Sequence, residues 1–325
     1  MLKKRLKLGL ALGGGSARGL THIGILKSLH KHKIYPDYIA GTSMGAVIGA
    51  FYSSGHSPEE IEDFFKTADW KKLIDFTVPK AGLIQGSVME EKLRRVLQNK
   101  SFQDLNPKLR VVAYNLDQLE KVVFFKGNVA RAVRASISIP GIFSPIKIAK
   151  HIYIDGGVID PTPYDVVREM GADVVIAVDL FSEDGTTKKG PEVKEKSFFT
   201  EFRERFIAEE LLQIKRYIIP EYWPDTLQNI FNWIFDKILY PAKIIKMMMG
   251  RELPQIAKVM NKTYGVLIAN LARERMKNAQ IEVKITPAFP NLSWADFDKV
   301  VEFTDIGEKA MDRKMGLLKR ELEKN

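Results

Sequence analysis

The sequence predicts an α/β fold, in which helices cover a mostly parallel central sheet and the C-terminal half adds a further helical segment. Three observations lead to this expectation. Apolar segments with strand character alternate with helical segments through the first half of the chain. The segment 173–178 is almost continuously apolar, as in a parallel strand buried on both faces. Hydrophobic residues make up 45% of the 325 residues, which is enough to bury a large core.

The elements of the first half follow from apolar spacing and from the residues that end each segment. Strand character occupies residues 8–12, 38–40, 109–114, 121–125, 151–154 and 173–178. Helical character occupies residues 19–32, 44–54, 87–98, 129–137 and 164–170. A further helix begins at Ser57-Pro58-Glu59-Glu60, where a capping serine precedes a proline and two acids. We therefore expect residues 1–184 to form the core of the fold.

The character of the chain changes after this core. Residues 182–195 are polar, lysine-rich and interrupted by glycine and proline, which predicts a loop. Residues 197–219 have helical character, and residues 227–240 place apolar side chains on one helical face and polar ones on the other. We expect residues 185–280 to form a helical, basic and amphipathic insertion or cap.

The end of the chain is expected to return to the core. Ile281, Val283 and Ile285 alternate with charged residues, which predicts a half-exposed strand. A charged helix follows from about Ala295 or later. Residues 281–325 therefore complete the predicted core with one strand and one helix.

Charge and composition limit the classes of partner. The formal net charge is +10, which suits anionic partners such as lipid headgroups, nucleic acid or acidic metabolites. The absence of cysteine excludes disulfides, thiolate metal sites and cysteine nucleophiles. The basic N-terminus resembles the start of a signal peptide, but its apolar run 8–12 ends at a glycine-rich turn and predicts a strand. We expect a cytoplasmic protein that contacts a membrane surface peripherally; the oligomeric state is not readable.

A serine between two glycines is the most informative motif. Gly41-Thr42-Ser43-Met44-Gly45 joins a strand-like segment to a helical one, which is the layout of a nucleophile elbow. Gly41 and Gly45 allow the strained turn and the close backbone approach that the elbow needs. The alternative is a tight turn with a capping serine. The placement between strand and helix favours Ser43 as a nucleophile for acyl chemistry.

A glycine-rich loop follows the first predicted strand and opens a helix. Backbone N–H groups in residues 13–19 can converge on one point, which suits a phosphate or an oxyanion. A dinucleotide-binding fold also begins this way and needs an acid about 20 residues further on, at the end of a second strand. Asp37 lies near that distance, but it precedes its strand instead of ending it, and the spacing of the glycines is imperfect. A P-loop is excluded because no Gly-Lys-Ser/Thr follows.

The histidines indicate which residue serves Ser43 as the base. Four of the five histidines cluster near the N-terminus and are expected on helix surfaces or in loops: His22, His30, His32 and His56. The fifth, His151, precedes Asp155, the candidate acid. A Ser–Asp–His triad in that chain order is therefore not available. Asp155, at the end of a predicted strand and followed by Gly156 and Gly157, is the best-placed carboxylate base, although an aspartate there is also a common turn former.

Together these motifs resemble the patatin-like phospholipase family, in its compact bacterial branch. The resemblance rests on residues 14–19, 21–24, 41–45, 135–141, 155–157, 160–163, 171–179 and 295–298. It covers most of residues 7–181 and about 281–315. The resemblance implies a three-layer α/β/α fold and hydrolysis of lipid acyl esters by a Ser–Asp dyad, without metal or cofactor.

The resemblance also assigns roles to individual residues. It implies that Ser43 is the nucleophile and Asp155 the proton acceptor. It places the oxyanion hole at the backbone N–H groups of Gly14, Gly15 and Ser16, with Arg18 holding that loop. Ser16 departs from the family pattern, which often has a third glycine there, so a requirement for positive φ at this position would place the loop under strain.

The basic segment 227–277 and the resemblance together indicate the partners of the protein. Between residues 237 and 277 there are nine Lys or Arg residues and two acids, beside apolar side chains. Residues 227–277 therefore suit binding to an anionic membrane surface. The alternative is that their helices pack on the core as a cap. The expected substrate is a phospholipid or lysophospholipid, and no nucleic-acid partner is expected. Acyl transfer to another acceptor and non-catalytic lipid binding are the alternatives.

Overall fold

A computed structural model describes residues 5–69, 82–181, 224, 227–229, 253–277 and 279–324. The chain divides into two compact units, residues 1–193 with 267–325, and residues 194–266. The predicted loop 182–195, the predicted helix 197–219 and all but the first turn of the predicted helix 227–240 lie outside the described residues. The boundaries 1–184, 185–280 and 281–325 stay a prediction.

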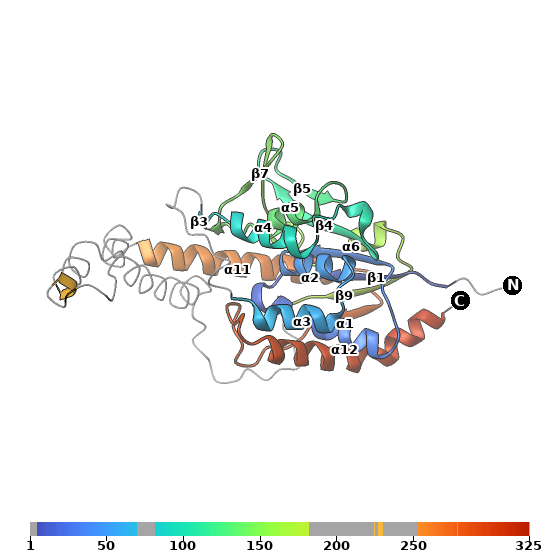
Figure 1. Cartoon of the computed structure of the whole chain (residues 1–325). Coiled ribbons are helices and arrows are strands. Elements are labelled where there is room, and N and C mark those ends of the chain that lie inside the picture. Colours follow the sequence, from blue (N-terminus) through green and yellow to red (C-terminus); the bar gives the residue numbers. More distant parts are fainter. Residues whose placement is uncertain are drawn as a thin grey trace. The chain divides into compact units, whose positions relative to one another are not determined.

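The first unit is built on an eight-stranded mixed sheet (Figure 1). The order is β10-β9-β1-β2-β4-β8-β7, with β5 pairing on β4. The strands are β1 (Leu8–Leu12), β2 (Tyr38–Thr42), β4 (Lys108–Asn115), β5 (Glu120–Phe124), β7 (Ile146–Ile148), β8 (His151–Asp155), β9 (Val174–Val178) and β10 (Val283–Ile285). The five strands from β10 to β4 are parallel, whereas β5, β7 and β8 are joined by antiparallel pairing. A separate parallel pair joins β3 (Gly82–Ile84) and β6 (Gly141–Phe143).

The helices connect these strands. They are α1 (Thr21–Lys31), α2 (Met44–Ser53), α3 (Pro58–Thr67), α4 (Ser87–Val96), α5 (Val129–Ser136), α6 (Tyr164–Glu169), α11 (Leu253–Lys277) and α12 (Val300–Glu323). Short 3₁₀ turns are η1 (Ser16–Leu20), η3 (Phe102–Asp104) and η4 (Gly156–Val158). The α3 start is a complete capping box, in which Ser57 and Glu60 each bond the other's backbone N–H. Among the described residues, no helix combines the length and the apolar character needed to cross a membrane.

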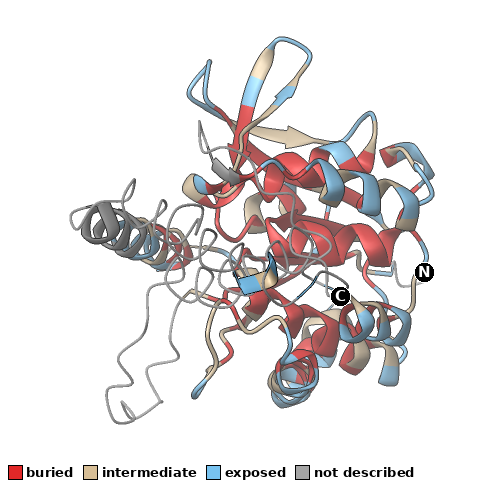
Figure 2. Ribbon diagram, turned by 60° about the vertical axis from the view of Figure 1, so that its left-hand side comes forward, coloured by how far each residue is buried: buried red, intermediate tan, exposed pale blue. Residues whose placement is uncertain are grey.

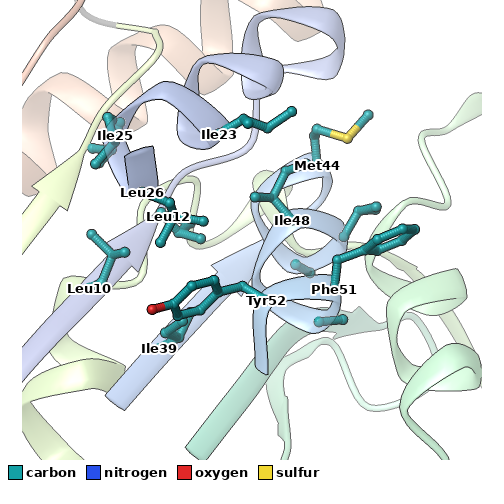
Figure 3. Packing of buried hydrophobic residues seen from close by; sticks show 14 of the residues in the cluster. Leu10, Leu12, Ile23, Ile25, Leu26, Ile39, Met44, Ile48, Phe51 and Tyr52 are labelled. Atoms are coloured by element: carbon teal, nitrogen blue, oxygen red, sulfur yellow. The ribbon is translucent and has the colours of Figure 1, made fainter. Parts of the chain in front are cut away.

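Helices cover both faces of the sheet because alternate residues of β1 point to opposite sides. Leu8, Leu10 and Leu12 belong to the larger core cluster, with apolar residues of α1, α2 and α12. Figure 3 shows part of this cluster, where Leu10, Leu12 and Ile39 of the strands pack beside Ile23 and Leu26 of α1 and Ile48 of α2. The opposite face uses small residues, including Ala11 and Ala40, beneath α6 and the end of α11. The three-layer arrangement predicted from the sequence is confirmed.

Helix α2 is buried along its whole length (Figure 2). Its ten residues include no charged side chain and have two glycines and two alanines, so the helix packs closely against its neighbours. Gly49 lies against Ile39 and Leu109, which a larger side chain would displace. Burial on all sides holds the N-terminus of α2 in a constant position at the end of β2.

Strand β4 brings together the two strand ends that carry the candidate site. β2 pairs with β4 up to Thr42↔Val112, and β8 pairs with it from Ala113↔Asp155 onward. β5 pairs with β4 opposite both of these stretches. Because a strand has only two edges, β2 and β8 lie along the same edge of β4 and meet at their C-terminal ends. Their last residues therefore face consecutive residues of one strand.

Candidate active site

Ser43 stands at the turn between β2 and α2. Its backbone has φ 53° and ψ −124°, a conformation that L-residues rarely adopt. The flanking glycines are needed for close approach: a Cβ at Gly41 would lie 2.5 Å from the Gly45 carbonyl oxygen, and one at Gly45 would lie 2.1 Å from the Leu12 carbonyl oxygen. This is the strained geometry of a nucleophile elbow, with the serine at a helix N-terminus.

The backbone amide of Ser43 is hydrogen-bonded to the last residue of α5, Ser136. It donates to Ser136 Oγ at 2.8 Å, and the Ser136 hydroxyl donates to the Val112 carbonyl of β4 at 2.6 Å. Ser136 is fully buried. The strained turn is therefore supported by a hydrogen-bonded chain that joins the elbow to β4.

Asp155 ends β8 and points at Ser43. The Ser43 hydroxyl donates a hydrogen bond to its carboxylate, and Gly157 N–H donates to Oδ1 at 2.7 Å. Burial raises the pKa of Asp155 to about 7, although both hydrogen bonds act in the opposite direction. A carboxylate with a pKa near neutrality, hydrogen-bonded to a hydroxyl, is suited to accept a proton and return it. Gly156 lets the chain turn here, since a Cβ would lie 2.5 Å from the Val112 carbonyl oxygen.

The glycine-rich loop lies beside Ser43. A Cβ on Gly14 would lie 3.3 Å from Ser43 Cβ. Gly13 N–H donates to Val178 O at 3.1 Å and Gly14 N–H donates to Pro161 O at 2.9 Å. The hydrogen bonds between described residues leave the Gly15 and Ser16 amides without an acceptor. The Gly14 amide, one of the three expected in the oxyanion hole, already donates its hydrogen bond to Pro161 O. The Gly15 and Ser16 amides are therefore the two candidate donors to an oxyanion.

Ser16 adopts a positive φ of 48°, so the position where the family often has glycine does require the left-handed region. Arg18 anchors the next turn: its guanidinium lies over the Trp294 and Phe289 rings, 4.2 Å and 4.9 Å from their centroids. Ala17 N–H also donates to the Trp294 carbonyl at 3.0 Å. The loop is thus attached to the segment that precedes α12.

His22 differs from its expected surface position. It is fully buried in the first turn of α1, and its Nε2 lies 2.7 Å from the Gly13 carbonyl oxygen. Burial lowers the pKa of His22 to about 4, so near neutrality the ring is uncharged and Nε2–H donates to Gly13. One sequence feature could have predicted this contact. His22 lies in the first helical turn after the glycine-rich loop, and helical side chains point back toward the preceding residues.

The sequence analysis also did not predict a cluster of charged side chains around Asp160, close to the candidate site. Asp160 is fully buried and forms ion pairs with Lys121 and Arg275. Its own carbonyl accepts a hydrogen bond from Thr42 Oγ1 at 2.8 Å. No cluster of three or more His, Asp or Glu side chains suited to a metal ion occurs in the described part of the chain.

Comparison with known proteins identifies the class. Residues 10–168 match the family model described as patatin-like phospholipase, so the chain contains a domain of this family. The matched residues include β2, the elbow, β4, β8 and the glycine loop. The recognition made from the separated motifs is confirmed.

Individual relatives occur in animals, fungi and bacteria. The chain is 35% identical over 189 residues to human patatin-like phospholipase domain-containing protein 6, a match covering 55% of this chain and 14% of the relative. It is 31% identical over 186 residues to Lysophospholipase NTE1 of Candida albicans, covering 55% of this chain and 13% of the relative. The chain thus spans a small fraction of these relatives' length. The crystal structure of VipD from Legionella pneumophila has a TM-score of 0.49 at 13% identity, covering 98% of this chain and 67% of that one.

Proposed function

We propose that the protein is a serine acyl hydrolase that cleaves lipid acyl esters. The observation that carries the proposal is the hydrogen bond from the strained Ser43 to the buried Asp155, whose pKa is raised to about 7. Membership of the patatin-like phospholipase family supports lipid esters as the substrate class. The family's description as phospholipase and the name of the Candida albicans relative, a lysophospholipase, favour phospholipids or lysophospholipids among them.

In the proposed reaction Ser43 Oγ attacks the ester carbonyl carbon while Asp155 takes the hydroxyl proton. The carbonyl oxygen becomes an oxyanion that accepts hydrogen bonds from the Gly15 and Ser16 amides. When the tetrahedral species collapses, the C–O bond to the alcohol breaks and Asp155 returns the proton to the leaving oxygen. Water, deprotonated by the same carboxylate, then attacks the carbonyl carbon of the acyl-serine. The C–O bond to Ser43 Oγ breaks, Asp155 returns the proton to Ser43 Oγ, and the fatty acid is released.

A fluorophosphonate probe tests the nucleophile, and hydrolysis of a short-chain p-nitrophenyl ester tests the dyad. We expect Ser43→Ala to lose both labelling and hydrolysis, and Asp155→Asn to lose hydrolysis. Ser53→Ala is the matched control, because Ser53 is a buried serine on the same helix whose hydroxyl has no hydrogen-bond partner among the described residues. Full activity in the Ser43 or Asp155 variant, with folding intact, contradicts the dyad.

Product analysis separates hydrolysis from acyl transfer, since both proceed through the same acyl-serine. Free fatty acid as the dominant product in the presence of a glycerol or lysolipid acceptor supports hydrolysis, whereas an acylated acceptor identifies a transferase. Binding of lipid without labelling of Ser43 identifies a non-catalytic lipid-binding protein. Contact with an anionic membrane through residues 227–277 stays a prediction, and much of that segment lies outside the described residues.

A further inference from the structure

A short segment after Asp155 contacts the other parts of the proposed active site. Residues 156–162, here called the linking segment, begin at the 3₁₀ turn η4, where Asp160 N–H donates to Gly156 O at 2.8 Å. The Asp160 carbonyl accepts from Thr42 Oγ1 at 2.8 Å, next to the nucleophile. The Pro161 carbonyl accepts from Gly14 N–H at 2.9 Å, in the glycine-rich loop. One segment therefore joins base, elbow and loop.

The linking segment is fixed through the side chain of Asp160. Lys121 Nζ lies 3.2 Å from Oδ2, and Arg275 Nη2 lies 3.0 Å from Oδ1. Both cations also lie 3.0 Å from Oδ2 of Asp165. The four residues come from β5, the linking segment, α6 and α11. Two carboxylates thus meet two cations in one balanced cluster behind the site.

Burial makes this cluster sensitive to the loss of any member. The Asp160 side chain is fully buried, and a buried charge is tolerated only when it is paired. Removing one partner leaves the others uncompensated, which is more disruptive than removing an exposed pair. Lys121 and Arg275 are therefore required for Asp160 to stay where it is.

Arg275 is itself held in place by α6 and by its own helix. Its guanidinium lies 5.5 Å from the Tyr164 ring centroid, and the Tyr164 hydroxyl donates to the Arg275 carbonyl at 2.8 Å. Ile268, Ala272 and Met276 bury the same end of α11 in the first unit. A Cβ on Gly157 would lie 3.7 Å from Ile268 Cδ1, so this end of α11 rests against the linking segment.

We propose that Asp160 is a positioning residue, held by Lys121 and Arg275, that fixes the linking segment and through it the separation of Asp155, Ser43 and the glycine-rich loop. Its catalytic consequence rests on the proposed function. Asp160 does not touch the reacting atoms in this scheme. A small displacement of the linking segment moves the base and the loop relative to the nucleophile, and misplacement of about 1 Å reduces a rate by roughly a hundredfold.

The test compares variants of the cluster with a matched ion pair elsewhere in the same unit. Asp160→Asn removes the central charge, Arg275→Met removes its partner, and Arg275→Lys retains the charge without the planar fork. The control is Glu282→Gln, which breaks the ion pair between Arg168 of α6 and Glu282, 2.7 Å apart, without touching the linking segment. Each variant is assayed for kcat and KM on a p-nitrophenyl ester, for the rate of fluorophosphonate labelling, and for amide hydrogen exchange.

We expect kcat per folded molecule to fall roughly tenfold to a hundredfold in Asp160→Asn and Arg275→Met, with KM nearly unchanged. Arg275→Lys should recover part of the loss. Labelling of Ser43 should slow in parallel, and peptides covering residues 13–16 and 41–45 should exchange faster than in the wild type. Glu282→Gln should lose stability but keep the kcat of its folded fraction.

Two results overturn the inference: wild-type kcat in folded Asp160→Asn and Arg275→Met, or an equal loss of kcat in Glu282→Gln. Failure of the proposed function is recognised separately, because the wild-type protein itself then shows no labelling of Ser43. In that case hydrogen exchange decides the inference. Faster exchange of residues 41–45 in Arg275→Met than in Glu282→Gln supports it, and equal exchange rejects it.

Discussion

Ser136 Oγ lies 2.8 Å from the Ser43 amide and accepts its hydrogen bond. The Ser43 N–H is therefore engaged by a buried side chain, and the strained elbow is supported by a residue 93 positions later in the chain. The same hydroxyl donates to the Val112 carbonyl, so both of its hydrogen-bonding roles serve the turn.

Ser136→Ala tests this support. The substitution leaves a buried N–H and a buried carbonyl without their partner, which destabilises a protein by about 1–3 kcal/mol. We expect that loss in the free energy of unfolding, measured by chemical denaturation, together with a lower rate of Ser43 labelling. Ser53→Ala removes a buried hydroxyl that has no hydrogen-bond partner among the described residues, so it should lower neither the free energy of unfolding nor the rate of labelling. Equal behaviour of the two variants contradicts the role of Ser136.

The pH dependence of hydrolysis reports the state of Asp155. Only the carboxylate accepts a proton, and the pKa of Asp155 is raised to about 7, so kcat/KM should rise with pH through this region and level off above it. Burial, assisted by Asp165, raises the pKa of Asp160 to about 6, so the profile is repeated in Asp160→Asn. The rise near pH 7 should persist there. A profile that levels off near pH 4 is incompatible with this assignment.

Folding stability should respond to pH in the opposite direction. The pKa of Asp155 is about 7 in the folded protein against 3.8 ordinarily, so between these values the folded chain holds a proton that the unfolded chain releases. The contribution to stability is present below pH 4 and is lost as pH rises through 7. Asp155→Asn does not titrate. Its free energy of unfolding should therefore gain on the wild type by up to about 4 kcal/mol between pH 4 and pH 8. A constant difference over this range rejects the raised pKa.

Ser16→Gly tests backbone strain in the glycine-rich loop. A non-glycine residue in the left-handed region costs about 1–2 kcal/mol, whereas glycine adopts it freely but loses more conformational entropy on folding. We expect a net gain of about 0.5–1 kcal/mol in the free energy of unfolding with labelling of Ser43 retained. Ser16→Val, whose β-branched side chain is disfavoured at positive φ, should lower stability instead. A stabilising Ser16→Val is the contrary result.

Two helical glycines provide a matched pair for the elbow. Gly45→Ala places a Cβ 2.1 Å from the Leu12 carbonyl oxygen in the sheet, whereas Gly316→Ala in α12 meets nothing within 4 Å. We expect Gly45→Ala to destabilise by more than about 3 kcal/mol and to abolish labelling. Gly316→Ala should stabilise by about 0.5–1 kcal/mol, the difference in helix propensity. Thermal denaturation of both variants distinguishes the close approach from propensity alone.

The elements near the site were predictable because their signals are local. Apolar runs bounded by glycine and proline located β1, β4, β8 and β9 within a few residues, and the elbow follows from the spacing of glycines around Ser43. The strands β3, β6 and β7 were not predicted: each has three residues, and none belongs to a longer alternating run such as the one from Ile281 that predicted β10.

Long-range contacts account for what the sequence did not reveal. The burial of His22, the bond from Gly14 to Pro161 and the cluster around Asp160 each join residues that only the folded topology brings together. A single histidine, proline or aspartate carries no mark of such a partner. The predicted roles of Ser43, Asp155, Gly15, Ser16 and Arg18 stay predictions until the variants are assayed.

The head-on meeting of β2 and β8 on one edge of β4 has a consequence for how the protein tolerates change. Main-chain pairing to Val112 and Ala113 places the ends of β2 and β8 next to each other, and the linking segment holds the residues that follow Asp155. Insertion or deletion of a single residue in β4 shifts the register with which β2 and β8 pair on this strand. Val112 and Ala113 are fully buried, so only exchanges of similar volume are expected to leave this arrangement in place, and any alteration in the length of β4 is expected to disrupt the proposed chemistry.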